Sequence, residues 1–423
     1  MDMLTRFDPN GEQLRDSPYE TYEHFRNIEP VHWGLPGVPG TEGAWYCFGY
    51  ADCERLLDDA RLGKEVFHRM PAERLARLPE TYRRYVEKVK NAMIVRDPPE
   101  HTRLRGLVNK AFTKDVVQQW QARVEEVTDE LLDGLAGRGR VDLIADFAVP
   151  LPVYVIGQMI GVPREARAEL KRWSVAITRS LAGSFADMQV YEDAVAAIDE
   201  FGAYILELAA RRRVEPRDDI ITKLVQAESE HGKLAPEEVV SMCRTLLVGG
   251  HETTTNLVGN GAWLLSHQHP DQGALLREDH SLWATAVVEI LRFESPVQYT
   301  FRIAYEDLQI GPHKVLAGQR VITMLGSANR DEGMFDRPRE FKVRGSGGRP
   351  VHFGRGPHHC IGSNLGAMEG RIALSRLFQR FPLLQIDAAR SAWRDNLQFR
   401  GLEVMPAALN GTRSKEVPSD TTQ

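Results

Sequence analysis

The segment 349–366, which reads RPVHFGRGPHHCIGSNLG, constrains the fold more than any other part of the sequence. Its glycines at 354 and 356 permit backbone torsions that other residues avoid, and they let the backbone approach another group closely. Directly after Cys360, the apolar residues Leu365, Met368 and Ile372 recur with helical spacing. The segment therefore predicts a tight loop that places a cysteine at the N-terminal end of a helix, where free amides favour a thiolate over a thiol.

Four interpretations of Cys360 follow from its neighbours. A lone cysteine is by default a small buried hydrophobe. His358, His359 and Cys360 could hold zinc, but adjacent ligands close a tetrahedron poorly and no second cluster with ligand spacing follows. Either histidine could serve as the base of a nucleophilic cysteine, so this alternative stays open. The fourth interpretation is a thiolate that ligates heme iron, a ligand that pushes electron density onto the metal and favours O–O cleavage.

The composition is that of an ordinary globular chain. Of the 423 residues, 42% are hydrophobic and 26% are charged. The net charge is −6 and no basic tail stands out, so nucleic acid is not an expected partner. The most apolar stretch, residues 147–163, is interrupted by prolines and a glutamine and is too short to span a bilayer. With a polar N-terminus and four scattered cysteines, the chain is predicted to be cytoplasmic and not anchored to a membrane.

Helical periodicity dominates the chain, and strand signals are fewer. Helices are predicted over 100–113, 115–137, 236–268 and 281–293, and strands within 44–50 and 301–325, where alternation around Gly311 and Gly318 indicates hairpins. No linker separates helical from strand-rich parts. The expected fold class is mostly α with small β-sheets (α+β), in a single domain over 1–423, with a polar tail from about residue 410.

The long helix predicted from Pro236 contains an unfavourable stretch, LVGGHETTT. Gly249 and Gly250 each cost about 1 kcal/mol relative to alanine inside a helix. One interpretation is that the glycines let another helix pack closely and that Thr253 bonds back to the carbonyl four residues earlier. The other is that they make room for a large flat group beside the helix, where Glu252 and Thr253 could hold water and pass protons into an apolar pocket.

A charged pair is predicted in the helix over 281–293. Glu289 and Arg292 are three residues apart and share one helical face. A surface salt bridge at this spacing contributes little stability. Because the flanking residues from Ala286 to Phe293 are mostly apolar, the pair is expected to be partly buried and structural.

On these motifs the sequence resembles the cytochrome P-450 superfamily of heme-thiolate monooxygenases, in its soluble bacterial branch. The heme-binding loop of that family reads F-G-x-G-x-H-x-C-x-G, and the chain has FGRGPHHCIG from Phe353 to Gly362. EILR matches E-x-x-R, GGHET matches [AG]-G-x-[DE]-T, and NRD at 329–331 also recurs in the family. The resemblance covers nearly the whole chain. It implies the cytochrome P-450 fold, with heme between the helix bearing GGHET and the helix after Cys360.

The resemblance also implies a role for each matching residue. Cys360 would be the axial iron ligand of heme b, with Phe353 packed near its sulfur. Glu252 and Thr253 would deliver protons during oxygen activation. Four residues would anchor the heme propionates: His101, Arg105, Arg302 and His358. Five residues would line the substrate pocket: Met93, Ile94, Val248, Gly249 and Val297.

The activity implied is that of a monooxygenase of secondary metabolism that hydroxylates or epoxidises a small hydrophobic organic substrate. Two electrons would come from NAD(P)H through a ferredoxin reductase and a ferredoxin, because no flavin or iron–sulfur motif is fused to the chain. A peroxygenase that uses hydrogen peroxide and a heme-binding sensor or carrier without turnover are alternatives. The intact Glu252–Thr253 pair argues against both. A monomer is expected.

The chain departs from the family pattern at several positions. Gly366 and Ala367 stand where alanine and often arginine are usual. The family usually has an arginine at the position of Glu340, which completes a triad with Glu289 and Arg292. Either Arg339 or Arg337 is expected to substitute, or the triad is incomplete.

Two charged regions also carry expectations. A ferredoxin is expected to dock where Cys360 approaches the surface, on Arg355 and His359 of the loop together with Arg103 and Lys110. For Arg103 taken alone, an ordinary solvated charge is the favoured interpretation. The segment 63–90 is rich in arginine and lysine but carries charges of both signs, which is typical of a solvated helix face.

Overall fold

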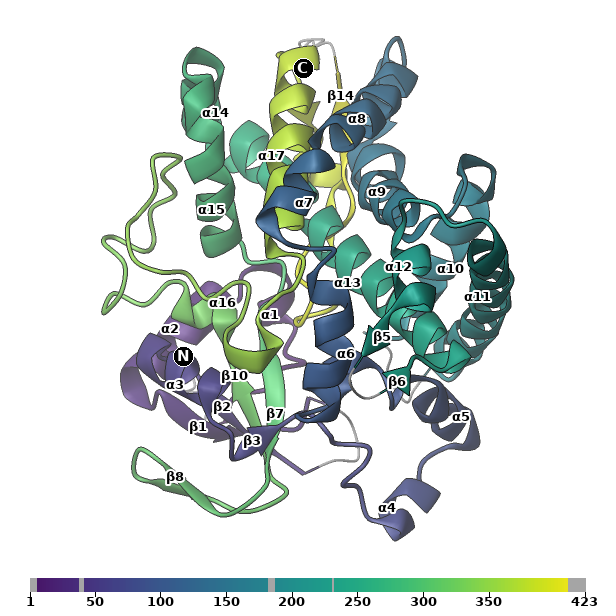
Figure 1. Cartoon of the computed structure of the whole chain (residues 1–423). Helices are drawn as coiled ribbons and strands as arrows, with labels where there is room; N and C mark the ends of the chain where they lie inside the picture. The colour runs from purple at the N-terminus through teal and green to yellow at the C-terminus, as the bar shows by residue number, and fades with distance from the viewer. Residues whose placement is uncertain (1–5, 38–41, 182–186, 230–231, 410–423) are drawn as a thin grey trace, which may run out of the picture.

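The computed structural model describes residues 6–37, 42–181, 187–229 and 232–409 (Figure 1). Figure 1 shows the larger sheet with α2 and α3 at the lower left, and the long helices above it and to the right. The prediction of a mostly helical fold with small sheets is confirmed. The polar tail predicted from about residue 410 lies outside the described residues.

Most of the described chain is helical. The α-helices are α1 Gln13–Asp16, α2 Tyr19–Ile28, α3 Tyr50–Asp58, α4 Ala72–Ala76, α5 Glu80–Val89, α6 Glu100–Asn109, α7 Lys114–Gln119, α8 Gln121–Leu135, α9 Pro150–Ile160, α10 Arg167–Arg179, α11 Gln189–Val214, α12 Ile220–Gln226, α13 Pro236–Trp263, α14 Pro270–Glu278, α15 Trp283–Phe293, α16 Leu325–Ala328 and α17 Ser363–Arg380. The predicted helix over 115–137 is divided at Trp120 into α7 and α8. Wide π-type turns lie before α9 at Ile144–Ala148 and after α13 at Leu264–Gln268.

The strands form one five-stranded sheet and several smaller ones. They are β1 Val31–Gly34, β2 Ala44–Cys47, β3 Leu62–Gly63, β4 Arg140–Asp142, β5 Glu228–Ser229, β6 Gly232–Lys233, β7 Thr300–Ala304, β8 Leu308–Ile310, β9 His313–Val315, β10 Arg320–Thr323, β11 Gln385–Ile386, β12 Ala392–Trp393, β13 Leu402–Val404 and β14 Pro406–Ala408. The five-stranded sheet has the order β1-β2-β10-β7-β3, with only the β2–β10 pair parallel. β8 and β9 form the predicted hairpin.

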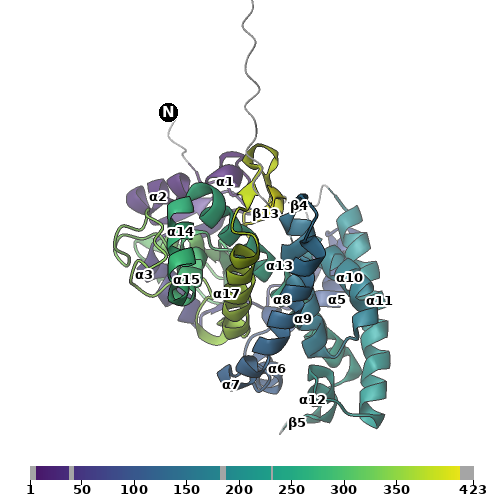
Figure 2. The same ribbon diagram turned by 90° about the horizontal axis from the view of Figure 1, so that it is seen from above.

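Helix α13 runs through the middle of the helical part. It packs against α9, α10, α11, α15 and α17, and its side chains are buried over most of its length. Seen from above, α17 lies beside α8, and α9, α10 and α11 follow further out (Figure 2). α13 is α-helical throughout, including Gly249 and Gly250. Its packing partners supply enough stability to hold two glycines in a regular helix.

The largest cluster of buried apolar side chains extends from Tyr85 to Leu409 and includes residues of α13, α15 and α17. Two smaller clusters cover the faces of the five-stranded sheet. Among the described residues, no helix is long and apolar enough to cross a membrane.

Candidate active site

The cysteine loop is built by backbone contacts. Gly354 has φ +67° and Gly356 has φ +70°, a region that favours glycine. A Cβ on Gly356 would also lie 2.8 Å from the carbonyl oxygen of Leu57. The amide of Cys360 donates to the carbonyl of Phe353 at 2.9 Å, which closes the loop three residues before α17 begins. The predicted loop and helix are therefore confirmed.

Opposing effects act on the pKa of the Cys360 thiol. Burial raises the pKa of its thiol, although the Gly362 amide and the Arg105 guanidinium act in the opposite direction. Desolvation therefore outweighs the helix N-terminus in the polypeptide alone. A cysteine in this setting becomes a thiolate when a metal ion supplies the positive charge, because metal coordination deprotonates a thiol outright.

The four residues predicted to bind propionates come from three parts of the fold: α6, β7 and the cysteine loop. His101 is buried on α6, and its ring lies 4.3 Å from that of His358 in the cysteine loop, measured between centroids. Arg105, one turn further along α6, donates to the carbonyls of Pro357 and His359 at 2.9 and 2.6 Å. Arg302 is buried on β7, where one guanidinium nitrogen, Nη2, donates to Leu57 at 3.2 Å. The other, Nη1, is buried with no hydrogen-bond partner among the described residues.

Asp97 is the carboxylate of this region, and sequence analysis missed it. It accepts hydrogen bonds from the imidazole of His358 at 3.4 Å, from the Tyr305 hydroxyl, and from the amides of Lys64 and Glu65 at 2.8 and 3.2 Å. Burial alone would raise its pKa, but these hydrogen bonds hold it well below the usual range. Its partners Lys64, Tyr305 and His358 are distant in the chain, so local sequence patterns do not predict this role.

The histidines of this region are expected to be neutral. Burial, followed by the charges of His358 and Arg105, lowers the pKa of His101 to about 4. Burial also lowers the pKa of His358, and the cations Lys64 and Arg302 contribute in the same direction. The region thus combines the cations Arg105, Arg302 and Lys64 with neutral imidazoles that can donate hydrogen bonds, which is the chemistry that a pair of carboxylates requires.

The middle of α13 has an open side at Gly249. Gly249 is exposed although its helix is mostly buried, and a Cβ there would meet nothing within 4 Å. Gly250 packs close to Ile156 of α9, at 3.6 Å from its Cβ position. The Thr253 hydroxyl donates to the Gly249 carbonyl at 2.9 Å, as the interpretation from helix packing predicted. The two glycines thus have different surroundings, and of the two only Gly249 leaves the surface of the helix uncovered.

Glu252 is buried and held by an ion pair. Arg394, which follows β12, pairs with its carboxylate, and the Asn256 amide donates to it at 3.4 Å. Arg394 is 142 residues away in the chain, so no sequence signal could have identified it. α17 meets this part of α13, because the Cβ position of Gly366 lies 3.7 Å from the Thr254 hydroxyl. Glu369, one turn further along α17, is buried, and burial raises its pKa to about 8.

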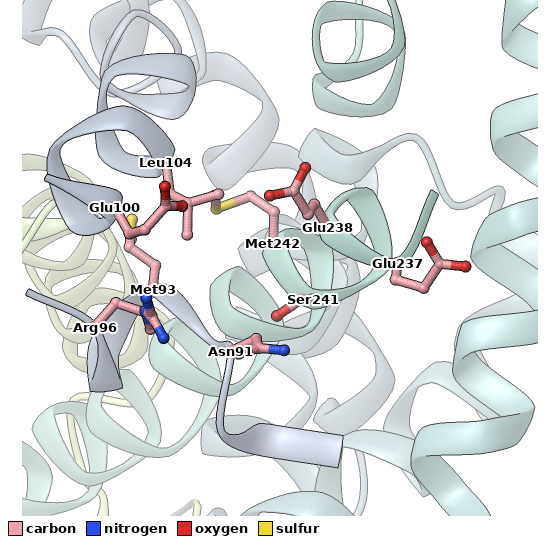
Figure 3. A pocket seen from close by; sticks show the side chains of 9 residues that line it. All are labelled: Asn91, Met93, Arg96, Glu100, Leu104, Glu237, Glu238, Ser241 and Met242. Carbon is pink, nitrogen blue, oxygen red and sulfur yellow. The ribbon is translucent and has the colours of Figure 1, made fainter. Parts of the chain in front are cut away.

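The five predicted pocket residues differ in their surroundings. Met93 lines a cavity of about 180 Å³ between α6 and the start of α13 (Figure 3). The walls of that cavity are largely polar: Asn91, Arg96, Glu100, Glu237, Glu238 and Ser241, with Leu104 and Met242. Ile94 is 59% exposed. Val248 and Val297 are half-buried. Gly249 lies about two helical turns beyond Met242, so the cavity in Figure 3 is separate from the open side of α13 at Gly249.

The Glu289–Arg292 pair is completely buried. Arg292 binds both carboxylate oxygens of Glu289, at 2.7 and 2.8 Å. Neither Arg337 nor Arg339 joins this pair, so the predicted triad is incomplete. Arg337 pairs with Glu340, and Arg339 is exposed and pairs with Glu23. The guanidinium of Arg292 donates its remaining hydrogen bonds to three backbone carbonyls and one hydroxyl, those of Asn329, Pro338, Glu340 and Ser346.

The basic surface predicted near Cys360 is mostly neutralised. Arg355 pairs with Asp58 at 2.6 Å and with Glu54 at 2.7 Å on α3. Arg103 is largely covered and pairs with Glu100 and Glu238. Arg355 is therefore paired with acidic side chains distant in sequence, and Arg103 is paired both with a neighbour on α6 and with a residue of α13. Lys110 is exposed and forms no ion pair among the described residues.

These features define a class of protein. A loop cysteine stands before α17, α17 meets the glycine–acid–threonine stretch of α13, and a donor-rich region lies beside the loop. The unpaired Nη1 of Arg302 and the open side of Gly249 fit a large flat cofactor that carries carboxylates. The arrangement is that of a heme-thiolate enzyme.

Comparisons with known proteins agree. Residues 186–396 match the family model Cytochrome P450. The chain is 35% identical to Polyketide biosynthesis cytochrome P450 PksS of Bacillus subtilis (strain 168), covering 96% of this chain and 98% of that protein. It is 37% identical to 6-deoxyerythronolide B hydroxylase of Saccharopolyspora erythraea, over 97% of this chain and 100% of that protein. The crystal structure of P450BioI with hexadec-9Z-enoic acid ligated acyl carrier protein superposes with a TM-score of 0.84, at 34% identity, covering 94% of this chain and 99% of that one.

The chain belongs to the cytochrome P450 family. Proteins of this family bind heme b and act as monooxygenases that receive electrons from redox partners. The resemblance found on the sequence motifs is thereby confirmed.

Proposed function

We propose that this cytochrome P450 hydroxylates or epoxidises a small hydrophobic organic substrate with electrons from NAD(P)H, delivered through a ferredoxin reductase and a ferredoxin. Heme b, when bound, supplies oxygen activation at a thiolate-ligated iron. One observation carries the proposal: the first turn of α17, just after Cys360, packs on α13 beside Glu252 and Thr253. The cysteine and the acid–threonine pair thus belong to elements in direct contact.

Each residue of the site has a role in this proposal. Cys360 holds the iron, with its loop fixed by the bond to Phe353. His101, Arg105, Arg302 and His358 hold the propionates. Substrate lies against the open side of α13 at Gly249, with Val248 and Val297 as apolar walls.

Proton delivery follows from the contacts of Glu252 and Thr253. Glu252 is buried, but its partner Arg394 has a side chain that is 25% exposed, so the ion pair connects the interior with solvent. The Thr253 hydroxyl donates to the Gly249 carbonyl at the open side of the helix. A proton accepted by Glu252 from the solvent side can therefore be passed on through Thr253.

Cys360 is tested by spectroscopy of the holoenzyme. Reduced protein with carbon monoxide is expected to show the strongly red-shifted Soret band of a thiolate ligand, and Cys360→His is expected to lose it. Cys243→Ala, which alters a buried cysteine on α13, is the control and should keep the band. A wild-type spectrum of the histidine type would overturn the assignment.

Turnover separates the proposal from its alternatives. Thr253→Ala is expected to retain heme and substrate binding while diverting electrons to hydrogen peroxide, whereas Thr245→Ala, two turns earlier on α13, serves as the control. An unchanged ratio of product to NAD(P)H consumed would show that Thr253 is not involved. A peroxygenase would form product from hydrogen peroxide equally well in both variants, and a sensor or carrier would form none.

The electron donor is proposed to dock beside the cysteine loop on exposed lysines. Lys110 at the end of α6 and Lys114 at the start of α7 are exposed and unpaired among the described residues, and α7 packs on α17. Lys110→Glu together with Lys114→Glu should slow reduction by ferredoxin at low salt, because opposite charges steer association. The same change at Lys223 and Lys314, which already form ion pairs elsewhere, is the control. The protein is proposed to act as a monomer, which light scattering tests.

A carrier-bound acyl chain is a second candidate substrate. The related P450BioI has been crystallised with an acyl carrier protein that bears a fatty acyl group. In the present chain Arg74, Arg77 and Arg83 of the α4–α5 region are exposed and form no ion pair among the described residues (Figure 1). Such a surface suits an acidic partner.

The two substrates are distinguished by comparing palmitic acid with palmitoyl acyl carrier protein in spectral titrations. Tighter binding of the carrier-bound chain, weakened by reversing Arg74 and Arg77 to glutamate, would support the second candidate. Equal binding of both forms would exclude it.

A further inference from the structure

Lys64 is a buried cation whose role no motif explains. It follows β3 directly, and its side chain is buried, with the residue only 7% exposed. Its ammonium donates to the Thr300 hydroxyl at 2.7 Å and lies 4.7 Å from the centre of the Phe301 ring. A neutral hydroxyl and an aromatic ring do not neutralise a buried charge, which normally has an ionic partner.

The register of the sheet places Lys64 beside Arg302. β3 and β7 are antiparallel, with Leu62 opposite Ala304 and Gly63 opposite Ile303. One step further along this register, Lys64 stands opposite Arg302. Like charges directly opposite each other on neighbouring strands destabilise a sheet. Two buried cations in this position therefore require an anion between or beside them.

No carboxylate of the described residues forms an ion pair with either cation. Asp97 is the nearby carboxylate, but its oxygens are occupied by His358, Tyr305 and two backbone amides. Among the described residues, neither the Lys64 ammonium nor the Arg302 guanidinium forms an ion pair, and Nη1 of Arg302 has no partner. Burial and the charge of Arg302 lower the pKa of Lys64 to about 7, although the charge of Asp97 acts in the opposite direction.

We propose that Lys64 is an additional cationic ligand of the heme carboxylates and acts together with Arg302. Heme b brings two carboxylates, and one of them placed between β3 and β7 satisfies both cations at once. Thr300 orients the ammonium by accepting one of its three N–H bonds, which leaves two for the carboxylate. Lys64 is thus a positioning residue for the cofactor and takes no part in proton delivery.

A carboxylate could also come from an acidic substrate, and the experiment distinguishes the two sources. Lys64→Met keeps the length of the side chain and removes the charge. Heme release from the ferric holoenzyme to excess apomyoglobin is expected to accelerate on the order of tenfold or more, because a charge-assisted hydrogen bond is lost. Lys314→Met, which removes an exposed lysine of the β8–β9 hairpin, should leave release unchanged.

Spectroscopy provides a second readout that does not depend on activity. The propionate bending modes in the resonance Raman spectrum of the holoenzyme should shift in Lys64→Met and, by a different amount, in Lys64→Arg. Lys64→Arg keeps the charge, and it is the variant to measure if Lys64→Met does not retain heme. Its heme release should lie close to that of the wild type.

Titration with myristic acid and its methyl ester completes the test. Both compounds should bind Lys64→Met and wild-type protein with the same affinity, judged by the spin-state shift. Unchanged heme release together with unshifted propionate modes would overturn the proposal. Selective loss of affinity for the acid, with heme release unchanged, would overturn it in favour of a substrate carboxylate.

Discussion

Two buried clusters of charge in this molecule differ in how completely the polypeptide satisfies them. Around Arg292, every guanidinium nitrogen has an acceptor, and Glu289 neutralises its charge. Around Arg302 and Lys64, one guanidinium nitrogen lacks any partner and neither head group contacts a carboxylate of the described residues. The first cluster is complete without a ligand, and the second is complete only with an anion.

Arg292 and Arg302 are both buried arginines, on α15 and β7, but only Arg292 is fully paired by the polypeptide. This difference in pairing separates a residue that stabilises the fold from one that binds the cofactor. A buried charge costs several kcal/mol unless it is paired, so a site left unpaired by the fold implies a ligand that pairs it. Substitutions in the complete cluster should therefore affect folding, and substitutions in the incomplete cluster should affect heme retention.

The largest effect is expected for Arg292→Ala. It leaves Glu289 buried without its partner and removes donors from the carbonyls of Asn329 and Pro338. Breaking a buried pair typically costs about 3–5 kcal/mol, so most of the protein should fail to fold. Expression yield and thermal unfolding measure this, with Arg337→Ala as the exposed control. A stable, heme-loaded Arg292→Ala protein would contradict the structural role.

A smaller effect is expected for Glu369, a buried acid without a cation. Its pKa is raised from 4.5 to about 8, mainly by burial, with the Thr254 hydroxyl opposing. Because the pKa is raised in the folded state, the stability that protonated Glu369 contributes is fully present below about pH 4.5 and is lost as the pH rises through about 8. Glu369→Gln should remove this dependence, so the difference in unfolding free energy between wild type and variant should change by up to about 3 kcal/mol between mildly acidic and mildly alkaline pH.

The measurement for Glu369 is denaturant unfolding of the holoenzyme at several pH values. Glu332→Gln alters an exposed acid, and its free energy of unfolding should change with pH in parallel with that of the wild type. Parallel curves for Glu369→Gln as well would mean that the carboxyl is already ionised in the folded protein.

Arg302→Leu should weaken heme retention and leave the fold largely intact. Loss of the guanidinium removes one hydrogen bond to the Leu57 carbonyl and one nitrogen that has no partner, so the free energy of unfolding should change little. Loss of a charge-assisted bond to a carboxylate is worth about 1.5–3 kcal/mol, which corresponds to heme release that is roughly ten- to a hundredfold faster. Far-ultraviolet circular dichroism and heme transfer measure the two properties separately. Unfolding comparable to that of Arg292→Ala would erase the distinction between the clusters.

How far the sequence predicts this site depends on whether partners are local. The cysteine loop, α17, the Glu289–Arg292 pair and the bond from Thr253 to Gly249 all join residues within a few positions of one another, and all were predicted. Asp97, Arg394 and the acidic partners of Arg355 approach through the tertiary fold, and none was predicted. Lys64 is intermediate, because the register of β3 against β7 decides its neighbour and that pairing is long-range.

The smallest effect is expected for Arg339, which was a candidate for the third member of the triad with Glu289 and Arg292. If Arg339 replaced the missing arginine, its removal would destabilise the protein nearly as much as removal of Arg292. In the structure Arg339 is exposed and pairs only with Glu23, and the Ser346 hydroxyl bonds to both Glu289 and Arg292, at 2.7 and 3.3 Å. Exposed pairs contribute about 0–1 kcal/mol, so Arg339→Ala should change the free energy of unfolding by less than about 1 kcal/mol. Ser346→Ala leaves a buried carboxylate with one bond fewer and should cost about 1–3 kcal/mol. Denaturant unfolding of both variants ranks them, and a larger loss for Arg339→Ala would mean that the arginine reaches the pair after all.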